Sequence, residues 1–236
     1  MRRTLLILGS LLLAALWFGP LPQLAQRAFF AHMIMHMGVV AVAAPLLALG
    51  IAGGRFDPVR KIPLLFAPIP AAVVELVVVW AWHAPTLHQE ARHCVAGLSA
   101  EQGMFLLAGL WVWLSAFGGG VWRSGNRTAA GIVGLLLTAM HMTLLGALLA
   151  LTPRPLYIYA EGLSRLTPLE DQHLGGAIML LTGGTAYLAG GLGLTAGLLR
   201  RPALAGGNGY EAAMGQNRSM ACRGRLRCGG VGYCAD

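Results

Sequence analysis

Long apolar stretches alternate with short polar segments along the chain as far as residue 199. Most of these stretches are long enough, at about 1.5 Å of rise per helical residue, to cross a hydrocarbon core about 30 Å thick. They lack the two-residue alternation of barrel strands, so the pattern predicts membrane-spanning helices. The predicted spans are residues 5–18, 29–51, 63–82, 102–121, 129–151 and 174–199.

Composition supports this fold class. Hydrophobic residues make up 56% of the chain and charged residues only 11%, whereas a soluble domain has about 25% charged residues. We therefore expect an all-α, polytopic transmembrane bundle of about six spans in residues 1–201. Residues 202–236 form a Gly-, Arg- and Cys-containing tail that we expect to be cytoplasmic and disordered. The first stretch has the length of a signal peptide, but the aromatic and proline residues that follow it favour an uncleaved span.

The basic residues are distributed unequally between the two sides of the predicted bundle. Of the 17 lysine and arginine residues, thirteen fall on the side that carries both termini and four on the other side. Because cytoplasmic loops are enriched in basic residues, we expect both termini to be cytoplasmic. The formal net charge of +8 then indicates contact with anionic lipid rather than with nucleic acid.

The seven histidines all fall on the outer half of the bundle in this orientation. His32 and His36 are four residues apart and therefore share one face of a predicted helix. His83 ends the third predicted span, His141 lies just past the middle of the fifth, and His173 opens the sixth. Ionisable groups inside a membrane span usually face the bundle interior and mark a functional site.

Methionines accompany these histidines at the same depth, with Met35 and Met37 beside the His32/His36 pair. Thioethers select Cu(I) and imidazoles suit copper, so the combination predicts a copper site. A buried methionine is also a common packing residue, and an interfacial histidine is often only hydrogen-bonded. The first-choice ligands are His32, His36 and His83, followed by His141 and His173, with Met35 and Met37 as soft additional ligands.

A second group of polar residues precedes the last span. Thr167, followed by Pro168 and by Glu170 at the third helical position, predicts a capping box at a helix start. Asp171 and His173 remain available for a site, and Asp171 or Glu170 could orient a ligand histidine. The tail cysteines are six residues apart, which does not match a zinc-binding pattern, and we expect them to be free thiols.

Several of these segments resemble the polytopic CtaG family of cytochrome c oxidase assembly factors. The resemblance covers about residues 28–199, and its most specific part precedes the last span. The segments are Phe30-Ala-His-Met-Ile-Met-His-Met37, Ala44-Pro-Leu-Leu47, Trp82-His83-Ala-Pro85, Thr167-Pro-Leu-Glu-Asp-Gln-His-Leu-Gly-Gly176 and Ile178-Met179.

The resemblance implies a multi-pass protein of the bacterial inner membrane that has no enzymatic activity of its own. It implies a role in building a haem-copper oxidase, with oxidase subunits as partners and copper held or delivered on the outer half of the membrane. At matching positions it indicates the residues His32, His36, His83, Glu170, Asp171 and His173.

Two positions depart from the family pattern. The family often has a Glu-His pair where this chain has Glu101-Gln102, and it usually has Asp-Gln-Gln where this chain has Asp171-Gln172-His173. Three alternative functions remain open on the sequence: a membrane cytochrome that binds haem between two histidines such as His36 and His141, a copper permease, and a scaffold that binds no metal.

Overall fold

The computed structural model describes residues 1–120, 124–157 and 166–200. The chain divides into two compact units, Met1–Leu198 and Leu199–Asp236, and the predicted tail with its three cysteines lies outside the described residues. All regular elements in the described part are helical, which confirms the all-α class. They are α1 (Arg2–Phe18), α2 (Leu21–Ala25), α3 (Phe29–Met37), η1 (Gly38–Ala43), α4 (Ala44–Ile51), η2 (Pro58–Arg60), α5 (Pro68–Trp82), α6 (Pro85–His93), α7 (Val95–Phe117), α8 (Gly125–Leu151) and α9 (Pro168–Leu199).

Four helical segments in the described residues are long and apolar enough to cross a membrane, and the bent pair α5–α6 makes a fifth candidate. The four are the continuous α3–η1–α4 segment, α7, α8 and α9. The chain is therefore a multi-pass membrane protein. The sequence pattern predicts about six spans, but α1 has only 17 residues, fewer than any of these four. Helix α7 also begins at Val95, several residues before the start predicted from hydropathy, so Glu101 and Gln102 lie inside a span.

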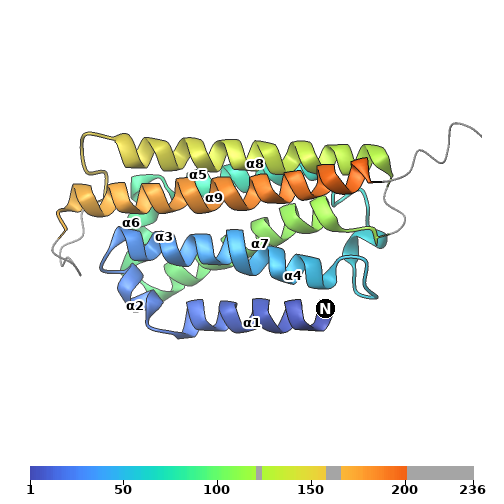
Figure 1. Ribbon diagram of the computed structural model, residues 1–236. Coiled ribbons are helices and arrows are strands. Elements are labelled where there is room, and N and C mark those ends of the chain that lie inside the picture. Colours follow the sequence, from blue (N-terminus) through green and yellow to red (C-terminus); the bar gives the residue numbers. More distant parts are fainter. Residues whose placement is uncertain (121–123, 158–165, 201–236) are drawn as a thin grey trace, which may run out of the picture. The chain divides into compact units, whose positions relative to one another are not determined.

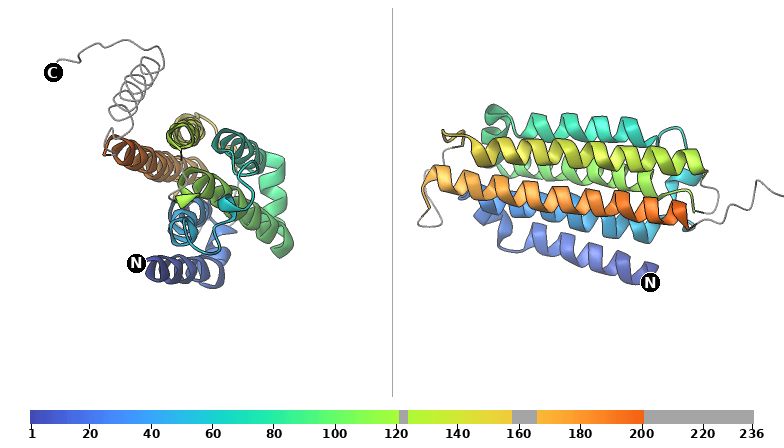
Figure 2. Two further views of the ribbon diagram at one scale, coloured as in Figure 1. Left: turned by 90° about the vertical axis from the view of Figure 1, so that its right-hand side faces the viewer. Right: turned by 45° about the horizontal axis from the view of Figure 1, so that its top comes forward.

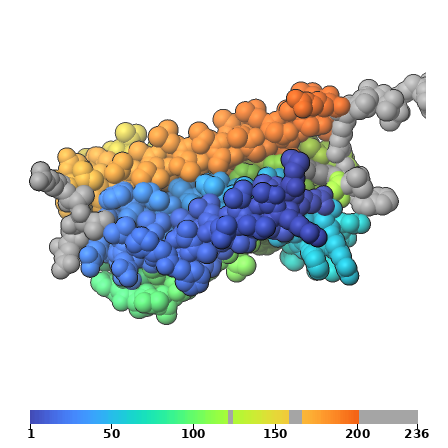
Figure 3. All heavy atoms as spheres, turned by 60° about the horizontal axis from the view of Figure 1, so that its bottom comes forward, coloured from blue at the N-terminus to red at the C-terminus, as the bar shows by residue number. Residues whose placement is uncertain are grey.

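The long helices of the Met1–Leu198 unit lie roughly along one direction, with α8 and α9 side by side (Figures 1 and 2). Close approach of these two helices depends on glycine: a Cβ on Gly146 would lie 2.6 Å from Leu180 N, and one on Gly176 would lie 2.5 Å from Ala150 N. Small residues permit such packing in lipid. Helix α1 covers one side of the unit, where it packs on α4 and η1 (Figure 3).

The span that carries His32 and His36 contains a π-helical segment, η1, between α3 and α4. Pro45, near the start of α4, explains it, because proline has no N–H and clashes with the preceding turn of an α-helix. Val40 O therefore lacks a normal helical donor. Instead it accepts a hydrogen bond from Trp113 Nε1 at 2.9 Å.

A second proline produces the bend between α5 and α6. Pro85 disfavours helical geometry at the residue before it, and Ala84 is accordingly extended, with ψ of 132°. The two helices meet at 72°. His83 lies at the bend and His88 lies in the first turns of α6, so the bend places two histidines close together in space.

We call the end of the bundle where α3 and α9 begin the histidine end, and the opposite end, where α1 begins, the arginine end. At the arginine end, Asp57 is buried and accepts hydrogen bonds from the backbone N–H groups of Gly53 at 2.6 Å, Val59 at 3.0 Å and Gly119 at 2.8 Å. Gly53 and Gly119 have φ of 66° and 90°, which glycine adopts without strain. Asp57 thus ties the loop after α4 to the end of α7.

Candidate metal centre

Three structural elements meet at the histidine end and bring together the side chains of His32, His88 and Glu101. His32 comes from α3, His88 from α6 and Glu101 from α7. One potential ligand atom from each residue lies within 4.8 Å of the others, and all three residues are buried. His32 Nε2 is 3.4 Å from Glu101 Oε1, and the His32 and His88 rings are 4.7 Å apart. We call this group the outer layer.

A second group of side chains is centred on His36, one helical turn after His32 on α3. The His36 and His83 ring centroids are 5.3 Å apart, and the ring of Phe105 packs against His36 at 3.9 Å. His141, from α8, lies near enough to His36 to interact with it electrostatically. We call His36, His83 and His141 the inner layer.

Many polar atoms of these two layers have no hydrogen-bond partner among the described residues. Among the described residues, none makes a hydrogen bond to either ring nitrogen of His32, His36 or His141, to His83 Nε2, or to either carboxylate oxygen of Glu101. Leaving a buried polar group unpaired costs roughly 1–3 kcal/mol. A cluster of several such groups is unfavourable unless a ligand binds to them, so the cluster is a candidate ligand-binding site.

His83 is held in one orientation. Its Nδ1 is 2.6 Å from Val79 O, and because a carbonyl oxygen can only accept, the ring proton must be on Nδ1. The lone pair on Nε2 is then available as a ligand. A backbone carbonyl that fixes the tautomer in this way is the usual support of a metal-binding histidine.

Two aromatic side chains cover the outer layer. Phe29 and Tyr157 stack with ring centroids 4.5 Å apart, and each ring also packs against His88, at 5.6 Å and 4.5 Å. Tyr157 Oη donates to His83 O at 2.5 Å. Burial, and secondarily the Glu101 carboxylate, raises the pKa of the Tyr157 phenol, so it remains a neutral donor. The aromatic pair separates the buried cluster from the end of the bundle.

The polar residues at the start of α9 position this end of the fold. Thr167 and Glu170 form the predicted capping box, with Thr167 N donating to Glu170 Oε2 at 2.8 Å and Glu170 N to Thr167 Oγ1 at 3.3 Å. The Asp171 carboxylate accepts from Phe29 N at 2.8 Å and from Phe30 N at 2.9 Å. Asp171 therefore anchors the first turn of α3, the helix that carries His32 and His36.

The remaining predicted ligands lie at different places. His173 is half-buried, and its Nε2 is 2.8 Å from Thr152 O. Met37 is buried and faces α9, since its sulfur would lie 3.6 Å from a Cβ on Gly183. His141, the predicted ligand on α8, lies in the inner layer near His36.

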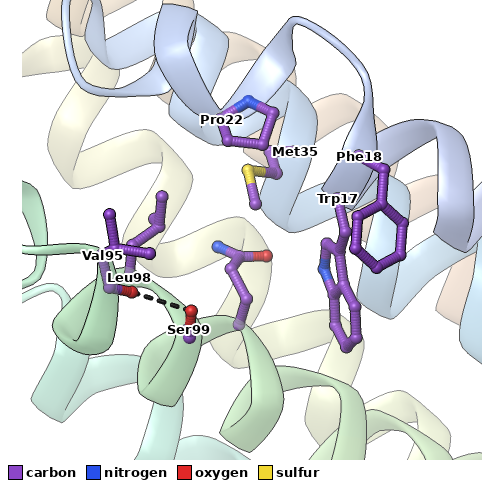
Figure 4. A pocket seen from close by; sticks show the side chains of 8 residues that line it. Trp17, Phe18, Pro22, Met35, Val95, Leu98 and Ser99 are labelled. Atoms are coloured by element: carbon purple, nitrogen blue, oxygen red, sulfur yellow. Dashed lines mark hydrogen bonds between the residues drawn. The ribbon is translucent and has the colours of Figure 1, made fainter.

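Met35 lines a pocket of about 310 Å³ between α1, α2 and α7 (Figure 4). The Gln102 amide also lines this pocket and has no hydrogen-bond partner among the described residues. The rest of the lining is mostly apolar: Trp17, Phe18, Pro22, Val95, Leu98 and Ser99.

The sequence pattern does not place His88 and Glu101 in the site. It predicts both outside the spans, His88 in a loop and Glu101 just before a helix. Two patterns pointed to them: Pro85 is a favoured first residue of a helix, which puts His88 on α6, and Glu101 is four residues before Phe105, so both lie on one face of α7.

The ligand atoms fit a transition metal. Imidazole nitrogen binds copper, zinc, iron and nickel, and a carboxylate adds a negative charge that offsets the charge of the ion. The outer layer has two imidazoles and one carboxylate, whereas the inner layer has only imidazoles. The fold and the site thus define a multi-pass membrane protein with a buried histidine cluster at one end.

Comparison with known families identifies the chain. The family model of the cytochrome c oxidase caa3 assembly factor (Caa3_CtaG) matches residues 1–201. The chain therefore belongs to this family, as the sequence resemblance predicted. Membership implies a non-catalytic role and an association with cytochrome c oxidase. Comparisons with curated proteins and with solved structures found no match.

Proposed function

We propose that this protein holds copper in the histidine cluster and delivers it to a haem-copper oxidase during assembly. The observation that carries the proposal is the convergence of His32, His88 and Glu101, whose ligand atoms lie within 4.8 Å of one another in a buried position. We choose copper among the possible metals because the haem-copper oxidase that is assembled contains copper. Copper is therefore cargo rather than a permanent cofactor.

We further propose that the histidine end faces the outside of a bacterial inner membrane, with both termini in the cytoplasm. Arg2, at the start of α1, donates to Gly53 O at 2.9 Å, so the N-terminus lies beside the basic loop that contains Arg55, Arg60 and Lys61. Basic residues concentrate on the cytoplasmic side. Six crossings then require α1 to span the membrane, and reporter fusions on either side of α1 would test this topology.

The direct test is oxidase assembly in cells that lack the native protein. A variant with His32→Ala, His88→Ala and Glu101→Gln should support at least about tenfold less oxidase activity than the wild type, because all three converging ligands are removed. The isolated oxidase should retain haem and lack copper.

His93→Ala is the matched control, because His93 is exposed on the same helix as His88. It should support wild-type activity. Full activity of the triple variant, at normal protein levels, would contradict the copper proposal and favour a scaffold without metal.

A haem-binding cytochrome is the alternative that the inner-layer histidines raise. The pair considered from the sequence, His36 and His141, would have to face each other across a porphyrin, yet Phe105 packs against the His36 ring at 3.9 Å. A visible absorption spectrum of the purified protein decides between the two. The copper proposal expects no Soret band, and a strong Soret band would contradict it.

A further inference from the structure

We propose that the histidine cluster contains two copper-binding positions in series rather than a single site. The first is the outer layer, and the second is formed by His36 and His83, with His141 beside them. This inference rests on the proposed function, because it assumes that copper is the metal. It adds that a copper ion moves between two sets of ligands inside the bundle.

The two levels are related because α3 and α7 each place one side chain at either level. On α3 the residues are His32 and His36, and on α7 they are Glu101 and Phe105. Four residues of α-helix advance about 6 Å, so the layers are one turn apart. Around the bend at Pro85, His88 supplies the outer layer and His83 the inner layer.

The ring contacts between the histidines occur within each layer. In the outer layer His32 contacts Glu101 at 3.4 Å and stacks edge-on with His88 at 4.7 Å. In the inner layer His36 lies 5.3 Å from His83, and Phe105 packs on His36. Phe105 occupies the α7 position that Glu101 occupies one turn earlier, so the inner position has an aromatic wall where the outer one has a carboxylate.

The inner position has lone pairs available for a metal. The Val79 carbonyl keeps the proton of His83 on Nδ1 and leaves Nε2 without a partner in the described part of the chain. Both nitrogens of His36, which is fully buried, are also without a described partner. Metal-free, these atoms would remain unpaired in an apolar environment, which is unfavourable.

The two donor sets suit successive steps of transfer. The outer position has a carboxylate and lies under the Phe29–Tyr157 cover, so it is nearer the end of the bundle. The inner position offers imidazoles alone, which suit copper and lack the oxygen ligand that harder cations prefer. Two cations about one turn apart repel each other in a medium of low dielectric constant, so the second copper ion should bind more weakly than the first.

The test is a Cu(I) titration of the full-length protein in detergent against a chromophoric chelator. All four cysteines are first replaced by serine, because free thiols bind Cu(I). We compare the parent, His88→Ala, His36→Ala, the double variant, and His93→Ala as control. We expect two equivalents in the parent and control, one in each single variant, and none in the double variant.

If the parent does not bind two equivalents of copper, the number that it binds shows whether only this inference fails or the proposed function fails as well. One equivalent in the parent, lost in both single variants, would mean a single shared site and would overturn only the two-position inference. No bound copper in the parent would overturn both. Because His36→Ala leaves a cavity in the core, we also label the histidine rings of the parent with ¹⁵N. Two successive sets of ring-nitrogen shifts during the titration support two positions, and one simultaneous set contradicts them.

Discussion

Two buried carboxylates at opposite ends of the bundle have opposite surroundings. Asp57, at the arginine end, accepts three hydrogen bonds from backbone N–H groups. Glu101, at the histidine end, is equally buried, yet no residue in the described ranges donates a hydrogen bond to either of its oxygens. Its Oε1 lies 3.4 Å from His32 Nε2.

The difference distinguishes the structural role of Asp57 from the binding role that we propose for Glu101. A carboxylate whose acceptors are all used stabilises the fold and has nothing left for a ligand. A buried carboxylate without donors costs stability and is retained where a ligand uses it. Glu75 lies between these cases, because Tyr187 donates to its Oε1 at 2.6 Å while Oε2 has no partner among the described residues.

The largest expected effect is on the arginine end. Asp57→Ala leaves three N–H groups without their acceptor. At roughly 1–3 kcal/mol for each buried unpaired donor, we expect a loss of about 3–9 kcal/mol in unfolding free energy. Thermal unfolding in detergent measures it. Glu90→Ala, at an exposed position, is the control and should change little. A small effect of Asp57→Ala would mean that water replaces this carboxylate.

A smaller effect is expected at the centre of the bundle. Tyr187→Phe removes the donor to Glu75 but keeps the ring that stacks on Trp113 at 4.9 Å. We expect a loss of about 1–3 kcal/mol and unchanged copper binding, as measured by thermal unfolding and Cu(I) titration. A loss of copper with normal stability would show that Glu75 belongs to the metal pathway.

Removing the helix cap of α9 should cost less again. Thr167→Ala removes one half of the capping box and should lower the unfolding free energy by about 1 kcal/mol. Thr185→Ala is a suitable control, because its hydroxyl donates to Leu181 O within the same helix. Equal effects of the two substitutions would argue against a specific role of the cap.

The smallest expected change in stability is at Glu101 itself. Glu101→Gln removes a carboxylate that lacks donors, so the unfolding free energy should change by less than about 1 kcal/mol. Copper affinity should nevertheless fall at least about tenfold. Strong destabilisation by this substitution would contradict this expectation and would mean that Glu101, like Asp57, has a structural role.

Much of this arrangement follows from local sequence patterns. Hydropathy predicts the helical membrane bundle, and the spacing Thr167–Glu170 predicts the capping box that the structure confirms. The spacing of His32 and His36 predicts a shared helix face, and both side chains lie in the buried cluster.

The partners of these histidines could not be read from the chain in the same way. Hydropathy averages place the start of α7 after Glu101, because the first turns of that helix contain polar residues. The bend at Pro85 brings His88 close to α3. The angle of 72° between α5 and α6 cannot be predicted from the spacing of residues along a helix. The bonding of Asp171 to the start of α3 joins residues more than 140 positions apart, which no local pattern predicts.

The most direct measurement is an X-ray absorption spectrum of the full-length protein, with its four cysteines replaced by serine, after loading with Cu(I). The account predicts a copper environment dominated by imidazole nitrogen, which weakens sharply in the variant with His32, His36, His83 and His88 replaced by alanine. A spectrum dominated by sulfur would contradict it, because the metal would then be held by methionine thioethers rather than by the buried histidine cluster.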